Sequence, residues 1–234
     1  EHISFRVERG QTLAIIGATG SGKTTLAGLI PRFYDATQGT VLVDGVDVRD
    51  YTFDALYDRL GYVTQKAVLF SGTVQDNIFF GQSEAADTDE TLQQALQLSQ
   101  AAEFVDRYPE KAAHPIAQLG RNVSGGQKQR LSIARALARK PEILIFDDSF
   151  SALDYKTDAT LREGLAKQLP GTTKIIVAQR ISTIRHADQI LVLDRGEIAG
   201  LGTHDALMAS CPVYREIAMS QLSEEELKKG GASK

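Results

Sequence analysis

A glycine-rich loop between an apolar strand and a helix constrains this chain more than any other stretch. The loop, Gly17-Ala18-Thr19-Gly20-Ser21-Gly22-Lys23-Thr24-Thr25, follows the apolar run Thr12 to Ile16 and precedes Leu26 to Ile30. Its glycines let backbone N–H groups converge without Cβ clashes, and the positive end of the helix dipole adds attraction for anions. Lys23 would neutralise the outer phosphates of a nucleotide, and the Thr24 hydroxyl would bind magnesium. A glycine-rich turn with a chance Lys-Thr is the alternative, but the Gly-x4-Gly-Lys-Thr spacing in a strand-to-helix context favours a site for a nucleoside triphosphate with Mg²⁺.

The composition is that of a globular protein. With 234 residues, 42% of them hydrophobic and 24% charged, the chain can form one large domain or a domain with an inserted subdomain. No apolar run approaches the roughly 20 residues that cross a bilayer, so any membrane role is expected to be peripheral or carried by other segments. The net charge of −4 provides no broad attraction for nucleic acid, and we expect no such partner. The single Cys211 excludes an internal disulfide, fits a reducing cytosol, and is expected near the surface.

Short apolar runs predict strands around the glycine loop. Ile3 to Val7 alternates as a half-buried strand does, whereas Thr12 to Ile16 is continuously apolar, like a buried parallel strand. Val41 to Val43 and Val46 to Val48 flank Asp44-Gly45, which is a hairpin signal. The early strands therefore predict an antiparallel sheet beside a nucleotide-binding core.

The next segment contains a candidate polar residue and then changes character. Tyr62-Val63-Thr64 is a short strand that places Gln65 at its carboxyl end, the edge where open α/β sheets bind ligands. A solvated loop residue is the alternative to a role of Gln65 toward magnesium or an attacking water. From about residue 71 to residue 140, strand-like runs give way to helical spacing, as in Thr91 to Ala102. This part is predicted to be an inserted α-helical subdomain.

Ser124-Gly125-Gly126-Gln127 begins the most clearly specified helix of that subdomain, which Pro141 ends. A helix N-terminus offers free N–H groups and a positive dipole end, so it can bind an anion. An ordinary serine cap followed by flexible glycines explains the same residues equally well. The pattern alone leaves both interpretations open.

Acidic and amide side chains follow two further predicted strands. Ile143 to Phe146 is a buried-strand run that ends in Asp147 and Asp148. An acid after such a strand binds magnesium in P-loop enzymes, which is the role expected of Asp147, and Asp148 stands where a base or water-orienting group would lie. The strand Lys174 to Ala178 brings Gln179 to the same edge.

The rest of the chain adds a loop, a helix, a hairpin and a tail. Ser151-Ala152-Leu153-Asp154 leads into a helix predicted over Tyr155 to Gln168. Gln189 to Leu193, followed by Asp194-Arg195-Gly196-Glu197, predicts a strand and a tight hairpin. Residues 221–234 are mostly charged and small, which predicts a flexible C-terminal tail.

Together these motifs resemble an ATP-binding cassette (ABC) domain, and the likeness extends from about Gly10 to Met219. In family order, the matching elements are the glycine loop, the Q-loop residue Gln65, the signature Ser124-Gly125-Gly126-Gln127, the strand and acid from Ile143 to Asp147, the D-loop Ser151 to Asp154, and a switch position at Gln179. The stretches Gln65 to Gly81, Ala178 to Thr183 and Gly202 to His204 are similar to exporter cassettes more than to importers.

The resemblance implies an α/β fold of the P-loop NTPase type over residues 1–220, with a mostly parallel core sheet, an antiparallel β subdomain and the inserted helical subdomain. It implies two cassettes that meet head to tail, each ATP lying between one glycine loop and the other signature. Thr24, Gln65 and Asp147 would hold Mg²⁺, and Asp154 would join the nucleotide contacts. Hydrolysis would drive transmembrane domains at the cytoplasmic face of the cell membrane. The family's adenine-stacking aromatic would lie upstream of Glu1, which indicates a domain of a longer half-transporter.

Two positions depart from the family pattern. A Glu usually follows the magnesium Asp, whereas Asp148 is one methylene shorter, and a misplacement of about 1 Å can cost on the order of a hundredfold in rate. The switch residue is usually His, whereas Gln179 can donate a hydrogen bond but cannot carry a proton. Both changes predict the degenerate half of a heterodimeric, multidrug-type exporter. Its own catalytic positions, Asp148 and Gln179, would support slow hydrolysis, and its signature would complete the competent site of a partner that has Glu and His.

Three other functions fit parts of the pattern. A fully active homodimeric ATPase would need Asp148 and Gln179 to reach far enough for catalysis. A soluble ABC protein of DNA repair or of ribosomes would carry a coiled-coil insertion or tandem cassettes, and neither a heptad run nor an internal repeat is present. A purely regulatory ATP-binding module differs from the degenerate cassette only in degree.

Overall fold

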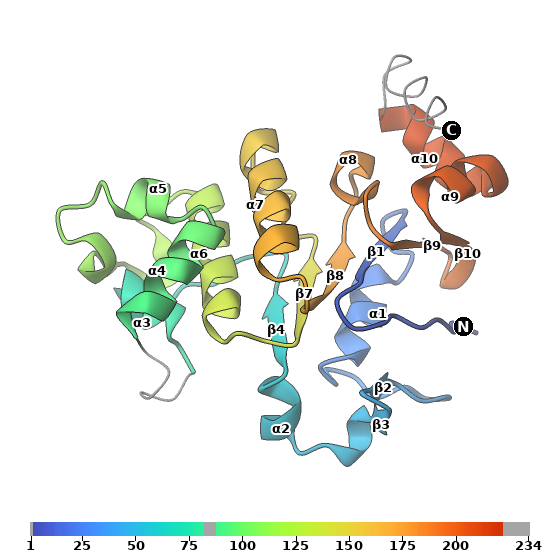
Figure 1. Ribbon diagram of the computed structural model, residues 1–234, viewed down its shortest axis with the longest axis horizontal. Coiled ribbons are helices and arrows are strands. Elements are labelled where there is room, and N and C mark those ends of the chain that lie inside the picture. The colour runs from blue at the N-terminus through green and yellow to red at the C-terminus, as the bar shows by residue number, and fades with distance from the viewer. Residues whose placement is uncertain (1, 82–87, 222–234) are drawn as a thin grey trace.

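In this computed structural model, the strand that precedes the glycine loop is an interior strand of the central sheet. The structure describes residues 2–81 and 88–221. Across the sheet the strands are β10 (Glu197–Gly202), β9 (Gln189–Asp194), β1 (Thr12–Gly17), β8 (Thr173–Val177), β7 (Ile143–Asp147) and β4 (Leu60–Val63) (Figure 1). Neighbouring strands are parallel except β10, which pairs antiparallel with β9. The predicted parallel core is therefore present, with β1 in its interior.

Both faces of this sheet are covered, which explains the continuous apolar runs of its strands. Leu13 and Ile15 of β1 pack in a cluster with Ala27 of α1 (Lys23–Leu29) on one face. Ala14 and Ile16 belong to the larger cluster on the other face, which includes residues of helices α6 (Gly125–Ala138), α7 (Tyr155–Gln168) and α8 (Ile181–Ile184). The glycine loop thus continues from a strand that is held on both faces.

Most of the regular structure in the described residues between 71 and 140 is helical. The elements are α3 (Val74–Ile78), α4 (Asp89–Leu98), α5 (Ala102–Val105) and α6, together with the short strand pair β5 (Gly72–Thr73) and β6 (Pro115–Ile116) and 3₁₀ turns at Lys111–Ala113 and Gln118–Gly120. In Figure 1 these helices gather at one end of the molecule, away from β9 and β10. The limits of the helical subdomain, about 71–140, remain a prediction.

The helical spacing from Thr91 to Ala102 corresponds to a helix for most of its length, but the helix breaks before Ala102. α4 ends at Leu98, and α5 begins at Ala102. The break occurs at Gln100, which has a φ of 61° and so turns the backbone into the left-handed region. The Ala101 N–H then donates to the Leu96 carbonyl at 2.8 Å, as in a Schellman motif. Gly or Asn usually marks such a position, and the sequence offers only a Gln there.

The early β structure is smaller than predicted. Strands β2 (Leu42–Val43) and β3 (Val46–Asp47) form the hairpin expected at Asp44-Gly45, where φ is 49° and 80°. A 3₁₀ turn at Val48–Asp50 and α2 (Phe53–Tyr57) follow. Residues 3–7 form no strand, although their side chains alternate in exposure and the apolar ones pack against the cluster that contains Leu13. The expected wider antiparallel sheet is therefore absent from the described residues.

The C-terminal part covers the sheet next to β9 and β10. The helix predicted over Tyr155–Gln168 is confirmed as α7, and α9 (His204–Ser210) and α10 (Pro212–Gln221) complete the fold. α10 extends to Gln221, and residues 222–234 of the predicted tail lie outside the described residues. No helix in the described ranges combines the length and the apolar character needed to cross a bilayer.

Cys211 contradicts the expectation of a surface position. It is buried, and its Sγ lies 3.6 Å from the Ala199 carbonyl oxygen. The reason is Gly200, where β10 makes a register shift and approaches α9 so closely that a Cβ would lie 2.8 Å from Leu207 Cδ2 and 3.0 Å from Cys211 Sγ. The glycine lets these elements pack directly on the strand.

This close approach predicts that Gly200→Ala lowers the free energy of unfolding by about 1–3 kcal/mol, because the added methyl overpacks the contact. Gly202→Ala is the matched control on the same strand, since its Cβ would meet neighbours only at 3.5 Å or more. That variant should be neutral or gain up to about 1 kcal/mol from reduced chain entropy. Urea unfolding measures both. Equal effects of the two substitutions would contradict this packing.

Candidate functional site

Four parallel strands bring the predicted site residues to one edge of the sheet. The glycine loop follows β1, Gln65 comes after β4, Asp147 ends β7, and Gln179 comes after β8. Because these strands are parallel, their carboxyl ends meet on the same side, which is where open α/β sheets bind ligands. The sheet topology thus assembles residues that are far apart in the sequence.

Lys23 is folded over the glycine loop. Its Nζ donates to the carbonyl oxygens of Gly17 at 2.9 Å and Ala18 at 2.7 Å, and lies 3.4 Å from Ser21 Oγ. Burial lowers the pKa of Lys23, and the negative charges of the two nearby aspartates partly oppose that shift. Gly20 and Gly22 have φ of 80° and 98°, and, apart from local backbone and the adjoining residues, no described atom lies within 4 Å of the Cβ that either would carry. Glycine is required there by the backbone conformation, and the loop keeps an open outer face.

Asp147 is hydrogen-bonded to Thr24, whose hydroxyl is predicted to bind magnesium. The Thr24 Oγ1 donates to Asp147 Oδ1 at 2.8 Å, and the Tyr62 hydroxyl donates to Oδ2 at 3.1 Å. Burial and the adjacent carboxylate raise the pKa of Tyr62, so this hydroxyl keeps its proton and acts as a donor. A carboxylate and a hydroxyl oxygen are the hard ligands that Mg²⁺ takes, usually with one or two carboxylates and substrate phosphates. This donor pair therefore fits magnesium.

Asp148 accepts hydrogen bonds from Gln65 and Gln179, the two glutamines predicted to lie at the site. Gln65 Nε2 donates to Asp148 Oδ2 at 2.9 Å, and Gln179 Nε2 donates to the same oxygen at 2.7 Å. Burial raises the pKa of Asp148, while these two donors pull it down. The residue has a φ of 49°, a conformation that Asp tolerates better than most side chains. Gln65 uses its nitrogen here, so its amide oxygen is the atom that could face a cation.

The signature residues form a capping box at the start of α6. The Gln127 N–H donates to Ser124 Oγ at 3.3 Å, and the Ser124 N–H donates to Gln127 Oε1 at 2.8 Å. The ordinary cap considered from the sequence is thus real, and it leaves the exposed Ser124 and Gly125 at the helix end. In Figure 1, α6 and α1 lie on opposite sides of β4 and β7, so the structure does not bring the signature to its own glycine loop.

Asp154 caps the helix that follows the D-loop. Its Oδ1 accepts from the Thr157 N–H at 2.9 Å, and its Oδ2 accepts from the Thr157 hydroxyl at 2.7 Å. These hydrogen bonds lower the pKa of Asp154. The D-loop itself approaches the signature, since a Cβ on Gly126 would lie 3.4 Å from the Ala152 carbonyl oxygen. A contact of Asp154 with nucleotide stays a prediction.

Sequence reasoning missed three side chains that hold the site in place. Besides Tyr62, the buried Gln129 of α6 donates to the Thr64 carbonyl at 3.1 Å, and the buried Ser149 donates to the Val63 carbonyl at 2.8 Å. Both bonds fix the backbone just before Gln65. Gln129 carried a signal, because it lies four residues before the buried Ile133 and so on the apolar stripe of the helix. A polar side chain on that stripe requires a buried partner.

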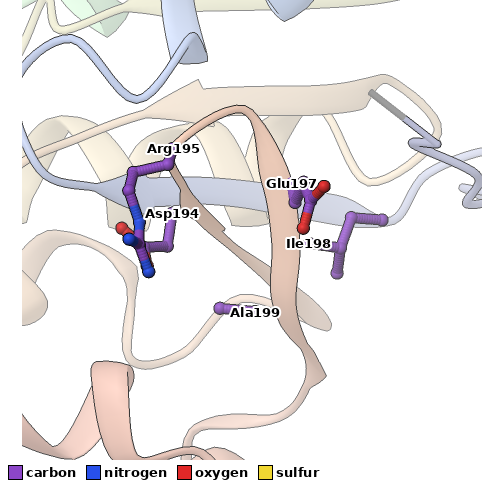
Figure 2. A pocket seen from close by; sticks show the side chains of 5 residues that line it. All are labelled: Asp194, Arg195, Glu197, Ile198 and Ala199. Carbon is purple, nitrogen blue, oxygen red and sulfur yellow. The ribbon is translucent and has the colours of Figure 1, made fainter.

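A hollow of about 360 Å³ lies at the β9–β10 hairpin. Its lining residues are Asp194, Arg195, Glu197, Ile198 and Ala199, and Figure 2 shows Asp194 beside Arg195 with Glu197 across the turn. Leu193, which precedes the hairpin, pairs with Gly17, so the hollow adjoins the same sheet edge. No residue of the glycine loop lines it, and we do not assign it to the phosphate site.

Comparison with known proteins identifies relatives that align with nearly the whole of this chain. A family model described as ABC transporter matches residues 1–151. The chain is 48% identical over 222 residues to an uncharacterized ABC transporter ATP-binding protein of Mycobacterium tuberculosis, and 42% identical over 219 residues to an ATP-dependent lipid A-core flippase of Albidiferax ferrireducens. Each alignment covers 94% of this chain and 38% of the relative, so the chain spans well under half the length of these proteins.

A solved structure shows the same likeness. The structure of a bacterial Atm1-family ABC exporter with ATP bound superposes with a TM-score of 0.87 at 38% identity. The match covers 92% of this chain and 38% of the exporter chain.

The two donors to Asp148 predict a measurable change in its pKa. Because both amides stabilise the ionised carboxylate, removing them in Gln65→Ala with Gln179→Ala should raise the pKa of Asp148 further, so that it takes up its proton at a higher pH. Titration of the carboxyl carbon by NMR measures this shift. Gln93→Ala, an exposed glutamine on α4, is the control and should leave the titration unchanged. A lower or unaltered pKa in the double variant would contradict the arrangement.

Proposed function

This chain belongs to the ABC transporter family and has its cassette fold, and from that premise we propose that it binds Mg-ATP at a head-to-tail interface with a second cassette and powers export by transmembrane domains. We further propose that its own site retains ATP and hydrolyses it slowly. The observation that carries this proposal is the convergence of Lys23, Thr24, Asp147 and Asp148 at one sheet edge, where the shortened acid is held by two neutral amides.

The binding half of the proposal rests on the glycine loop and Asp147. Lys23 already bonds to the loop carbonyls, and its ammonium can exchange these neutral acceptors for charged phosphate oxygens, which form stronger hydrogen bonds. Thr24 and Asp147 present adjacent oxygens, and Tyr62 holds the second carboxylate oxygen in place. Bound Mg²⁺ would supply charge neutralisation on the terminal phosphates. ATP is the nucleotide expected from the family.

The proposal of slow hydrolysis rests on how far the Asp148 carboxylate extends and not on its affinity for protons. The raised pKa of Asp148 makes its carboxylate a better base, which by itself favours catalysis. A general base must, however, come within about 2.6–3.2 Å of the proton it takes, and Asp is shorter than Glu by one methylene. Both amides also occupy Oδ2, and Gln179 can donate a hydrogen bond without gaining positive charge. Geometry therefore limits this site more than proton affinity does.

The need for a second cassette follows from the position of the signature. Ser124 is exposed at the start of α6, and α6 lies on the opposite side of β4 and β7 from α1, the helix that follows the glycine loop (Figure 1). The helix end offers N–H groups and a positive dipole to an anion, and an ATP held by another cassette would supply that anion. We propose a partner with Glu and His at the positions of Asp148 and Gln179, so that this signature completes the competent site.

The transmembrane partner is proposed to dock at an exposed aromatic pair. Phe70 and Phe80 stack with ring centroids 4.2 Å apart, and both remain more than 40% exposed. The Arg135 guanidinium of α6 lies 5.4 and 5.7 Å from these rings and also donates to the Asn77 and Val68 carbonyls. A membrane domain seated here would be linked to the signature helix. The lipid A-core flippase and the Atm1-family exporter that resemble this chain are each more than twice its length, which supports such a domain and a location at the cytoplasmic face of the membrane.

The asymmetric pair predicts unequal effects of losing the loop lysine. In the reconstituted heterodimer, Lys23→Ala should weaken ATP binding here but leave most of the ATPase activity, because this site turns over slowly. The equivalent change in the partner should reduce the activity by at least about tenfold more, a difference of about 1.4 kcal/mol in the barrier. Steady-state ATPase rates measure both. Lys167→Ala, which changes an exposed lysine on α7, is the control. Equal losses of ATPase activity on replacing the two loop lysines would contradict the asymmetric model.

Restoring the usual residues should restore hydrolysis. Asp148→Glu with Gln179→His should raise the single-turnover rate of this chain between about tenfold and a hundredfold, because the base regains its reach and the switch can carry a proton. Either substitution alone should gain less, since each leaves one defect in a contact the two residues share. Asp205→Glu on the exposed side of α9 is the control. Fast turnover by the unaltered chain, with no gain in the double variant, would favour the fully active homodimeric ATPase instead.

A further inference from the structure

We infer that Gln221, at the end of α10, is a positioning residue that sets the backbone of the switch position Gln179. Its Nε2 donates to the Gln179 carbonyl at 2.7 Å, and its Oε1 accepts from the Ile181 N–H at 2.9 Å. One amide side chain thus spans the three residues of the switch from a helix 40 residues further along the chain. This inference rests on the proposed function, in which Gln179 faces the phosphates of bound ATP.

The contact with Ile181 replaces a missing helix cap. α8 begins at Ile181, and its N-cap residue Arg180 makes no side-chain cap bond. The first N–H groups of a helix have no partner within the helix, so a side chain or water must satisfy them. Gln221 supplies that acceptor for Ile181, whose own side chain is fully buried. The start of α8 is therefore fixed from outside.

Fixing this backbone fixes the direction of the Gln179 side chain. The Gln179 carbonyl bonds to Gln221, while its side-chain nitrogen donates to Asp148 Oδ2 at 2.7 Å. Between them, the Arg180 guanidinium donates to the Ser151 carbonyl of the D-loop at 3.1 Å. A fixed peptide sets the direction of the Gln179 Cα–Cβ bond, and the hydrogen bond to Asp148 then holds the rest of the side chain in one rotamer. The switch is thus held by three separate elements.

Gln221 can act in this way because α10 is itself anchored. Tyr214 and Ala218 of α10 are fully buried, and the Tyr214 hydroxyl lies 2.8 Å from His204 Nδ1 of α9. The Arg215 guanidinium donates to the Met208 and Ala209 carbonyls at 2.9 and 2.8 Å. The contacts of Tyr214 and Arg215 tie the first half of α10 to α9, and the buried Ala218 packs its second half into the core. A shift of α10 would therefore move or release the switch.

The chemistry of the clamp requires an amide of this length. A glutamine side chain donates and accepts at once, as the carbonyl and N–H of the switch demand. Glutamate keeps the shape and the acceptor but has no N–H for the Gln179 carbonyl. Alanine loses both bonds. The two substitutions therefore separate the two contacts.

The test uses the full chain with Gln221→Ala and Gln221→Glu. Amide hydrogen exchange by NMR should show the Ile181 N–H exchanging roughly threefold to tenfold faster in Gln221→Ala, and about as slowly as wild type in Gln221→Glu. Single-turnover ATP hydrolysis should fall roughly threefold to tenfold in both variants, with the ATP affinity within about twofold of wild type. In a Gln179→Ala background, both Gln221 substitutions should have no further effect on turnover.

Glu216→Ala, exposed on the same helix, is the matched control and should change neither measurement. Unchanged exchange at Ile181 in Gln221→Ala, or a loss of turnover that persists in the Gln179→Ala background, would overturn the positioning role. If the wild-type chain fails to bind ATP, the proposed function fails, while the exchange measurement still decides whether the clamp exists.

Discussion

The parallel pairing of β1 with its neighbours is the constraint on which the site depends. Gly17 ends β1 in register with Leu193 of β9, and a Cβ on Gly17 would lie 2.1 Å from the Leu193 carbonyl oxygen. Only glycine allows this approach, so the loop leaves the sheet at a fixed place. The same parallel register carries β4, β7 and β8 to that edge, and their last residues meet there. Backbone pairing thus brings the glycine loop, Asp147 and Gln179 to the same edge of the sheet.

The polar groups at this edge satisfy one another. Asp147 is held by Thr24 and Tyr62, Asp148 by Gln65 and Gln179, and Lys23 by the loop carbonyls. Burying a polar group costs free energy unless the group is hydrogen-bonded, so these contacts stabilise the site. Nucleotide and magnesium would replace several of these bonds with stronger charged ones. In the function proposed above, bound nucleotide would replace these internal partners, and turnover would depend on how far the Asp148 carboxylate can then reach.

Three connections link this edge to distant parts of the molecule. Gln129 of the signature helix bonds to the backbone before Gln65, and Arg135 of the same helix holds the segment from Val68 to Asn77. Asp158 of α7 is buried and bonds to Arg162 and to the Thr183 hydroxyl of α8, which follows the switch. Each connection joins a segment near this edge to a longer helix that packs on the sheet, because short segments and loops have few apolar contacts of their own to hold a position.

The sequence by itself determined which types of side chain are available at the candidate site and where the local helices, strands and turns form. The glycine loop, the strand before Asp147, the helix over Tyr155–Gln168 and the hairpin at Asp44-Gly45 follow from spacing, apolar runs and turn residues, which act over a few neighbouring positions. The tertiary structure decided what depends on distant neighbours. The helix break at Gln100, the burial of Cys211 against Gly200, the hydrogen bond from Tyr62 to Asp147 and the clamp from Gln221 to the switch each join residues whose partners no local pattern names. A side chain's type limits which bonds it can form, but only the packed sheet and helices determine which partner comes within about 3 Å of it.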